Sequence, residues 1–121
     1  MVTLPTTIDV AAISDTGRVR EHNEDAVWFG DAFFRDGFRS RRIGPDEVDG
    51  VVLAVADGVG GAAAGEVASR WVAEQMARRI GAITGSRRAD GLQRGAATEA
   101  MVKRIAADVN EELIREGERR P

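Results

Sequence analysis

The chain has 121 residues, a length that suits one domain with a core of modest size. Hydrophobic residues make up 43% and charged residues 31%, which is the composition of a folded protein and not of a disordered one. A formal net charge of -3 argues against a nucleic-acid partner, and without cysteine there are no disulfides, no thiolate catalysis and no cysteine-ligated zinc.

The N-terminal residues carry no basic segment followed by an apolar core. No apolar stretch of the sequence approaches the ~20 residues that a membrane span needs. We therefore expect a cytoplasmic protein with no membrane partner.

The first half of the chain predicts strands. Residues 8–13 end at a cluster of turn formers, and residues 26–29 form a second short apolar run. Residues 30–50 carry several charges, glycines and one proline, so we expect a connecting loop or an irregular hairpin there. Its aromatic residues are expected to pack down: Phe33, Phe34 and Phe38. Residues 51–56 are apolar without alternation, which predicts a central strand covered on both faces.

The second half predicts two long antiparallel helices. In the first, over about 63–80, an apolar row lies opposite a row of alternating charge. The apolar row is Ala68, Val72, Met76 and Ile80, and the charged row is Glu66, Arg70, Glu74 and Arg78. We expect Gly81 and Gly85 to end this helix and residues 86–91 to form a loop. The second helix, over about 93–116, is expected to pack on the first through Ala97, Met101, Ile105, Val109 and Leu113.

Asp57 and Gly58 stand where the apolar run 51–56 ends and a glycine-rich turn begins. A carboxylate at such a break can face a hard cation while the neighbouring backbone carbonyl approaches the same ion. Upstream, Glu24 and Asp25 follow Arg20, and two carboxylates with one guanidinium can together hold cations and a phosphate. The two segments together predict a site for metal ions and phosphate.

Each of these residues has a simpler interpretation when it is taken alone. Asp57 would be a helix N-cap, and Glu24 and Asp25 would begin a solvated strand. Arg20 would be a surface charge. Glu66 suits the dipole of a first helical turn without any catalytic role. The upstream cluster therefore decides in favour of a site at Asp57.

A competing interpretation takes residues 58–63, after a strand, as a dinucleotide-binding fingerprint of the G-x-G-x-x-A kind. Asp57 would then place a negative charge beside the pyrophosphate, and no strand-terminal acid follows about 20 residues on. A P-loop is excluded because the sequence contains no Gly-Lys-Ser or Gly-Lys-Thr triplet.

Four segments in order resemble the opening motifs of bacterial PP2C-type (PPM family) metal-dependent protein phosphatases. They are GRVR at 17–20, NED at 23–25, ADGVGG at 56–61 and AGEVAS at 64–69. The resemblance covers residues 8–69, and the second predicted helix lies where such a domain has its second long helix. It implies an α+β fold in which residues 1–121 are the N-terminal part of an α-β-β-α sandwich, with the C-terminal half absent.

The resemblance also implies hydrolysis of phosphoserine or phosphothreonine in proteins by water activated between two Mn²⁺ or Mg²⁺ ions. By position, Asp57 would bridge both ions, and Glu24 and the Gly58 carbonyl would complete the second metal site. Asp25 would hold metal-bound water, and Arg20 would bind the substrate phosphate. The implied catalytic residues are thus Arg20, Asp25 and Asp57, and the implied partners are a phosphorylated protein substrate and a cognate Ser/Thr kinase.

The sequence departs from the family pattern in two places. Complete members carry at least two further aspartates that finish the first metal site, and this chain ends before them. Val59 stands where eukaryotic relatives often have a histidine. We therefore expect half a site, no turnover by the 121 residues alone, and an exposed apolar sheet face. The alternative is a catalytically inactive truncated or regulatory phosphoprotein-binding module.

Overall fold

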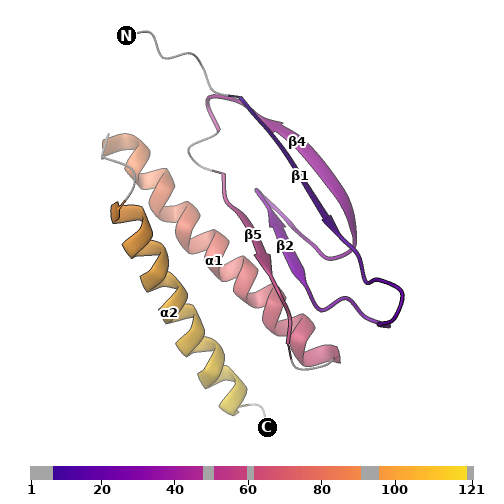
Figure 1. The fold of residues 1–121 in the computed structure, drawn as a ribbon. Coiled ribbons are helices and arrows are strands. Elements are labelled where there is room, and N and C mark those ends of the chain that lie inside the picture. The colour runs from indigo at the N-terminus through magenta and orange to yellow at the C-terminus, as the bar shows by residue number, and fades with distance from the viewer. Residues whose placement is uncertain (1–6, 48–50, 60–61, 91–95, 120–121) are drawn as a thin grey trace.

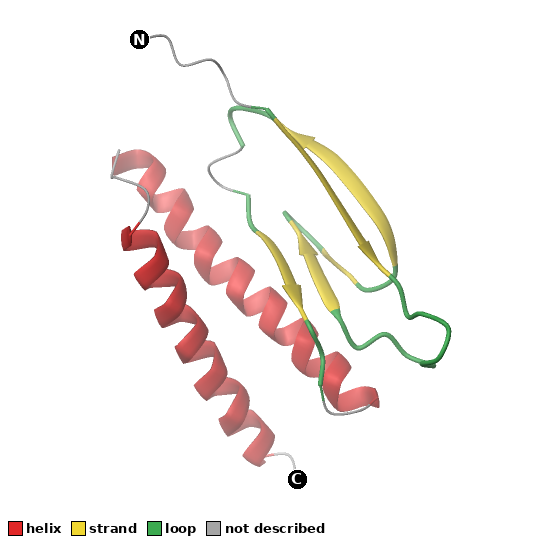
Figure 2. Cartoon of the chain, in the orientation of Figure 1, coloured by secondary structure: helices red, strands yellow, loops and turns green. Residues whose placement is uncertain are grey.

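The computed structural model describes residues 7–47, 51–59, 62–90 and 96–119, and within these ranges it is an α+β fold (Figures 1 and 2). The strands are β1 (Ile8–Ser14), β2 (Ala26–Phe29), β3 (Phe33–Phe34), β4 (Gly37–Ile43) and β5 (Leu53–Ala56). The helices are α1 (Ala62–Asp90) and α2 (Ala96–Arg119). The predicted order, strands first and two long helices after them, is confirmed.

The strands form two antiparallel sheets. One pairs β1 with β4, and the other has the strand order β3-β2-β5. Between the sheets lies a buried cluster of Val27, Phe29 and Phe34, against which Val10 and Ala12 of β1 pack. Because side chains alternate along a strand, Trp28 and the residues level with it point to the other face, which α1 covers.

The residues of α1 that face the sheet are small. The most buried ones recur at a spacing of four: Gly65, Ser69, Ala73 and Ala77. The predicted apolar row of α1, which begins at Ala68, is half-buried, so its residues are not the most buried ones of the helix. Small side chains at the buried positions let the helix backbone approach the strands closely.

The two helices form an antiparallel pair (Figure 1). On α2, Ile105 and Val109 are buried and Met101 and Leu113 are half-buried, which confirms the predicted row; the Ala97 side chain lies outside the described residues. Arg79 of α1 donates to both carboxylate oxygens of Glu112 at 3.0 and 2.6 Å. Neither helix, over the residues described, has the length and apolar character that crossing a membrane requires.

The helix boundaries differ from those predicted. α1 continues through Gly81 and Gly85 to Asp90, so the expected helix end and the loop over 86–90 are wrong. An interior glycine costs only ~1 kcal/mol relative to alanine, which tertiary packing offsets. A Cβ added at Gly81 would lie 3.8 Å from a methyl group of Val52, so the helix passes close to the chain before β5. Residues 91 and 93–95 lie outside the described ranges.

Two predictions for the strands also need correction. Within residues 30–47 the structure has β3 and the seven-residue β4, which pair with β2 and β1 and not with each other. Neither the connecting loop nor the irregular hairpin describes this segment. Phe33 and Phe34 pack as expected, whereas Phe38 is 65% exposed. β5 is an edge strand and not a central one, because β2 lies in the middle of its sheet. Leu53 and Val55 on β5 are 46% and 76% exposed, so β5 is not covered on both faces.

Candidate metal and phosphate site

The predicted site residues Asp25 and Asp57 lie at the same end of the β2–β5 pair. Ala26 is the register partner of Ala56, and the two aspartates are the residues directly before Ala26 and directly after Ala56. Two segments that are distant in the sequence thus meet at one end of the β2–β5 strand pair. α1 begins at Ala62, so Asp57 is not the N-cap residue of this helix.

Gly58 is the point of closest approach between these segments. Its buried backbone amide donates a hydrogen bond to Oδ1 of Asp25 at 3.2 Å. A Cβ added at Gly58 would lie 2.2 Å from the backbone oxygen of Glu24 and 2.8 Å from that of Gly65. No side chain fits in that space, so the glycine is required by the packing of the backbone.

Glu24 is held against the start of α1. Its carboxylate lies so close to Gly65 that a Cβ added at that glycine would be 2.6 Å from Oε2. The hydroxyl of Ser69, one turn further along α1, hydrogen-bonds to the Glu24 carbonyl and also lies 3.2 Å from the Glu66 carbonyl. Gly65 and Ser69 therefore fix Glu24 from the helix side. Glu66 itself lies beyond the first turn of α1, contrary to the prediction.

Asn23 fixes the same loop from the side of the strands. The two N–H bonds of its buried side-chain amide are shared among three acceptors, Ser14 Oγ at 2.8 Å, the Arg35 carbonyl at 2.8 Å and Asp36 Oδ1 at 2.9 Å. Its Oδ1 accepts a hydrogen bond from the Asp25 amide at 3.1 Å. The side chain thus satisfies its polar atoms within the protein while it shapes the backbone that carries Asp25.

Arg35, in the turn between β3 and β4, completes this arrangement and was not among the predicted site residues. Its Nη1 donates to the Asn23 carbonyl at 2.8 Å, and its Nη2 donates to the Glu66 carbonyl at 2.7 Å. The half-buried guanidinium also lies 5.4 Å from the centroid of the Phe33 ring. In the sequence this arginine looks like one more charge in a polar turn, and no local signal marks its role.

The remaining predicted residues are exposed. Arg20 lies in the loop between β1 and β2, and no hydrogen bond or ion pair joins it to another described residue. Asp57 is exposed beside the buried Gly58. Over the described part of the chain, no group of three or more His, Cys, Asp or Glu side chains is placed to hold a metal ion. The structure thus brings together Glu24, Asp25 and Gly58, and it leaves Arg20 outside this cluster.

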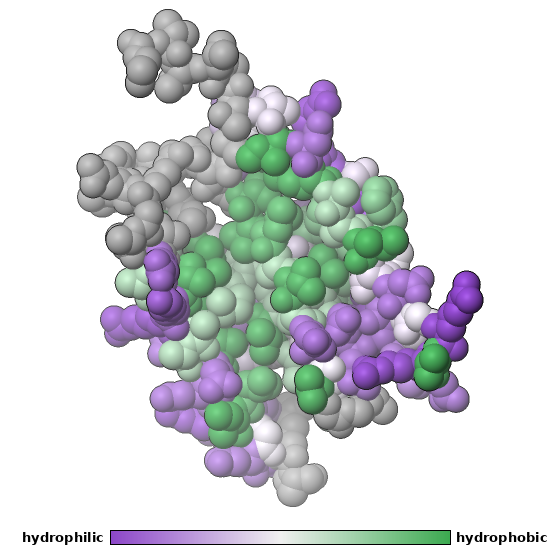
Figure 3. Space-filling model, in the orientation of Figure 1, coloured by the Kyte–Doolittle hydropathy of each residue, from purple (hydrophilic) through white to green (hydrophobic). Residues whose placement is uncertain are grey.

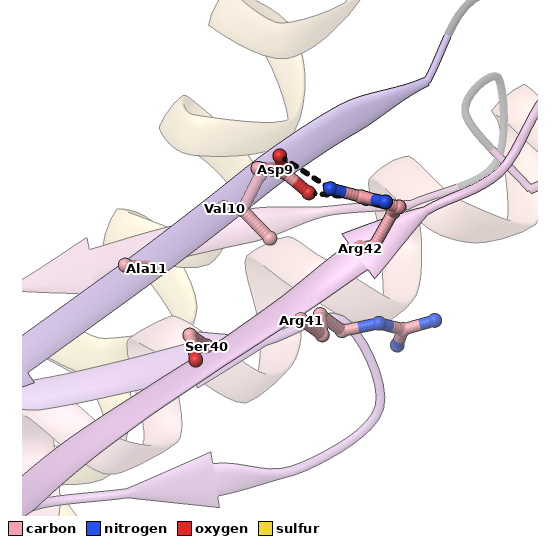
Figure 4. A pocket seen from close by; sticks show the side chains of 6 residues that line it. All are labelled: Asp9, Val10, Ala11, Ser40, Arg41 and Arg42. Carbon is pink, nitrogen blue, oxygen red and sulfur yellow. Dashed lines mark hydrogen bonds and ion pairs between the residues drawn. The ribbon is translucent and has the colours of Figure 1, made fainter.

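A separate shallow pocket of about 420 Å³ lies on the β1–β4 sheet (Figure 4). Within it, Arg42 makes two hydrogen bonds to Asp9, at 2.7 and 3.1 Å, and these lower the pKa of the Asp9 carboxyl. The residues that line the pocket are Asp9, Val10, Ala11, Ser40, Arg41 and Arg42. The Glu24 loop follows the opposite end of β1, so this pocket belongs to a different part of the molecule.

The order of the described elements also differs from that of the dinucleotide-binding fingerprint. That fingerprint requires a strand, a helix and a second, parallel strand in one unit. Here β5 is followed by α1 and then α2, and all strand pairs in the described ranges are antiparallel.

Comparison with protein-family models, with curated proteins and with solved structures found no match to this chain.

Proposed function

We propose that these residues form one part of the active site of a metal-dependent phosphatase, acting in the cytoplasm, that hydrolyses phosphoserine or phosphothreonine in a protein substrate. In this proposal the fold is the N-terminal part of an α-β-β-α sandwich. Two facing sheets with a helical layer against one of them agree with that architecture. The proposal also draws on the four sequence segments that resemble the opening motifs of PP2C-type phosphatases.

The observation that carries the proposal is the convergence of Glu24, Asp25 and Gly58. These residues come from two motifs that are separated by about thirty positions, and the hydrogen bond from Gly58 to Asp25 spans 33 residues of sequence. The close packing of the Gly58 backbone against the Glu24 carbonyl keeps the two motifs in contact, as a shared site would require.

The donor groups suit Mn²⁺ or Mg²⁺. Carboxylate oxygens of Glu24, Asp25 and Asp57 and the backbone carbonyl of Gly58 are hard oxygen ligands, which both ions prefer. A pair of such ions lowers the pKa of bound water and so supplies a nucleophile at neutral pH. Arg20 is proposed to bind the substrate phosphate through its planar guanidinium. Arg20 is exposed, so its guanidinium is accessible to a substrate.

The experiment that tests this proposal is Mn²⁺ binding by the chain, measured by titration calorimetry and by electron paramagnetic resonance. We expect weak binding by the wild type, because water supplies many of the ligands, and a loss of about tenfold or more in Asp57→Asn and Glu24→Gln. Asp31→Asn, the same substitution at an exposed aspartate in the β2–β3 turn, is the matched control and should bind as the wild type does.

Two results would contradict the proposal in different ways. A wild-type chain that binds no Mn²⁺ would overturn the metal function as a whole. Equal binding by the wild type and Asp57→Asn would remove Asp57 from the metal site while leaving Glu24 to be judged from its own variant.

A further inference from the structure

We propose that Arg35 is a positioning residue that ties the acidic loop 23–25 to helix α1 and so sets the place of Glu24; its role in metal binding rests on the proposed function. The guanidinium donates to the backbone carbonyls of Asn23 and Glu66, which lie 12 and 31 residues from it in the sequence. One side chain thereby connects the β3–β4 turn, the loop and the helix.

The tie is reciprocal. Arg35 donates from its side chain to the backbone carbonyl of Asn23, and Asn23 donates from its side chain to the backbone carbonyl of Arg35. Each residue therefore fixes the main chain of the other. Asn23 is buried and also binds Ser14, so the loop is held to β1 as well as to the turn.

The geometry requires an arginine. Two N–H groups of one planar guanidinium reach two separate carbonyls at 2.8 and 2.7 Å, and a lysine ammonium has no such rigid fork. Phe33 adds a cation–π contact, since the Arg35 guanidinium carbon lies 5.4 Å from its ring centroid. Arg70 of α1 lies 4.8 Å from the same centroid, so the ring itself is held between the turn and the helix.

Both ends of the tie adjoin proposed ligands. Asn23 is directly followed by Glu24 and Asp25, and Ser69, which hydrogen-bonds to the Glu24 carbonyl, lies 3.5 Å from Nη1 of Arg35. Without Arg35, the Asn23 and Glu66 carbonyls would each lose a charged donor, and the bridge that one side chain makes between the loop and α1 would be lost. Hydrogen bonds to the residues that bind a metal orient these ligands. In other metal sites their loss commonly weakens metal binding by roughly 10- to 100-fold.

The first test needs no metal. Hydrogen exchange of the Asp25 and Gly58 amides, measured by NMR, reports on the loop because both amides donate to side chains of loop residues, Asn23 and Asp25. Arg35→Gln should speed both by about tenfold, the size expected for loss of a hydrogen bond from a charged donor, and Arg35→Lys should give a smaller increase. Arg79→Gln is the matched control. Arg79 also donates hydrogen bonds from both terminal nitrogens, to Glu112 across the helix pair and to Gln75, and its replacement should leave both amides unchanged.

Unchanged exchange rates of the two amides in Arg35→Gln would overturn the proposal. An equal increase of these rates in Arg79→Gln would also overturn it, because that result indicates a loss of global stability. If Arg35→Gln does not fold, Arg35→Lys carries the same test with the same expected direction.

The second test measures Mn²⁺ affinity of the same proteins. Arg35→Gln should bind Mn²⁺ about tenfold more weakly than the wild type, and Arg79→Gln should bind equally. Faster exchange with unchanged Mn²⁺ affinity would overturn the positioning role. No Mn²⁺ binding by the wild type would instead overturn the proposed function, while the exchange result would still decide whether Arg35 holds the loop.

Discussion

The backbone amide of Gly58 donates a hydrogen bond to Oδ1 of Asp25 across 3.2 Å. One carboxylate oxygen of Asp25 is thereby directed at the turn after β5, and the orientation of this side chain depends on the position of the Gly58 backbone. The two halves of the candidate site are consequently one packed unit, in which a change at Gly58 is felt at the acidic loop.

We predict that Gly58→Ala lowers the free energy of unfolding by about 2–3 kcal/mol, the upper part of the range for overpacking. The added methyl group would overlap the backbone oxygens of Glu24 and Gly65, which cannot rotate away as a side chain does. Urea denaturation followed by circular dichroism measures the change. Gly117→Ala is the control, because nothing lies within 4 Å of the added Cβ and alanine favours the helix. Equal stability of Gly58→Ala and the wild type would contradict the described packing.

The ion pair between Arg79 and Glu112 predicts a pH dependence of stability. The hydrogen bonds from Arg79 hold the pKa of the Glu112 carboxyl below its ordinary value of 4.5. A carboxyl with a lowered pKa in the folded state stabilises it above the unfolded pKa, and this contribution is lost as the pH falls through the folded pKa. The pair is partly exposed, so the effect is small and is screened by salt.

The measurement is the thermal midpoint of the wild type and Glu112→Gln from pH 7 down to pH 3. We expect the wild type to be the more stable at neutral pH and the two midpoints to converge on acidification below the ordinary pKa of 4.5. Glu111→Gln, which removes an exposed partner of Arg115 on the same helix, serves as a control with a smaller difference. A constant difference across this pH range would show that Glu112 contributes through packing and not through its charge.

The uncovered face of β5 predicts self-association. Leu53 and Val55 are on the face of the sheet that carries Val27 and Phe29, but they remain exposed, and apolar side chains gather over the strands in Figure 3. Exposed apolar side chains on an edge strand favour contact with other chains. In sedimentation velocity the wild type should associate as its concentration rises, and the double variant Leu53→Thr, Val55→Thr should remain monomeric.

Val67→Thr is the matched control for this prediction, because Val67 is an exposed valine on α1 and its replacement should leave the association unchanged. A wild-type chain that stays monomeric at every concentration tested would refute the prediction.

The sequence was sufficient for elements with a strong local pattern. Residues 26–29 were predicted with their observed bounds, and the row from Met101 to Leu113 identified the face of α2 that packs on α1. β4 was missed because its Gly-Phe-Arg-Ser-Arg-Arg-Ile sequence is polar, and it becomes a strand by pairing with β1 along its whole length. Local propensity is a weak guide where such long-range pairing decides the structure.

The candidate site shows the same division. Spacing and residue type were enough to predict that Glu24, Asp25 and Gly58 belong together, because each precedes or follows a strand that could be recognised. The contacts that place them could not be predicted, since Arg35 donates to the backbone carbonyls of Asn23 and Glu66, Asn23 donates to that of Arg35, and a carbonyl leaves no trace in the sequence. The place of Arg20 relative to the cluster likewise depends on the path of a loop.

The hydrogen bonds of Arg35 and Ser69 also constrain when the acidic loop can become ordered during synthesis. β1 and β4 are complete once residue 43 has been made, so their pairing can precede the helices. The loop at Glu24 must wait for its anchors, because Glu66 and Ser69 are added more than forty residues later, and the Ser69 bond alone spans 45 positions. A ribosome that pauses between these points would hold a nascent chain in which β1 and β4 can pair while the loop still lacks its hydrogen bonds to α1.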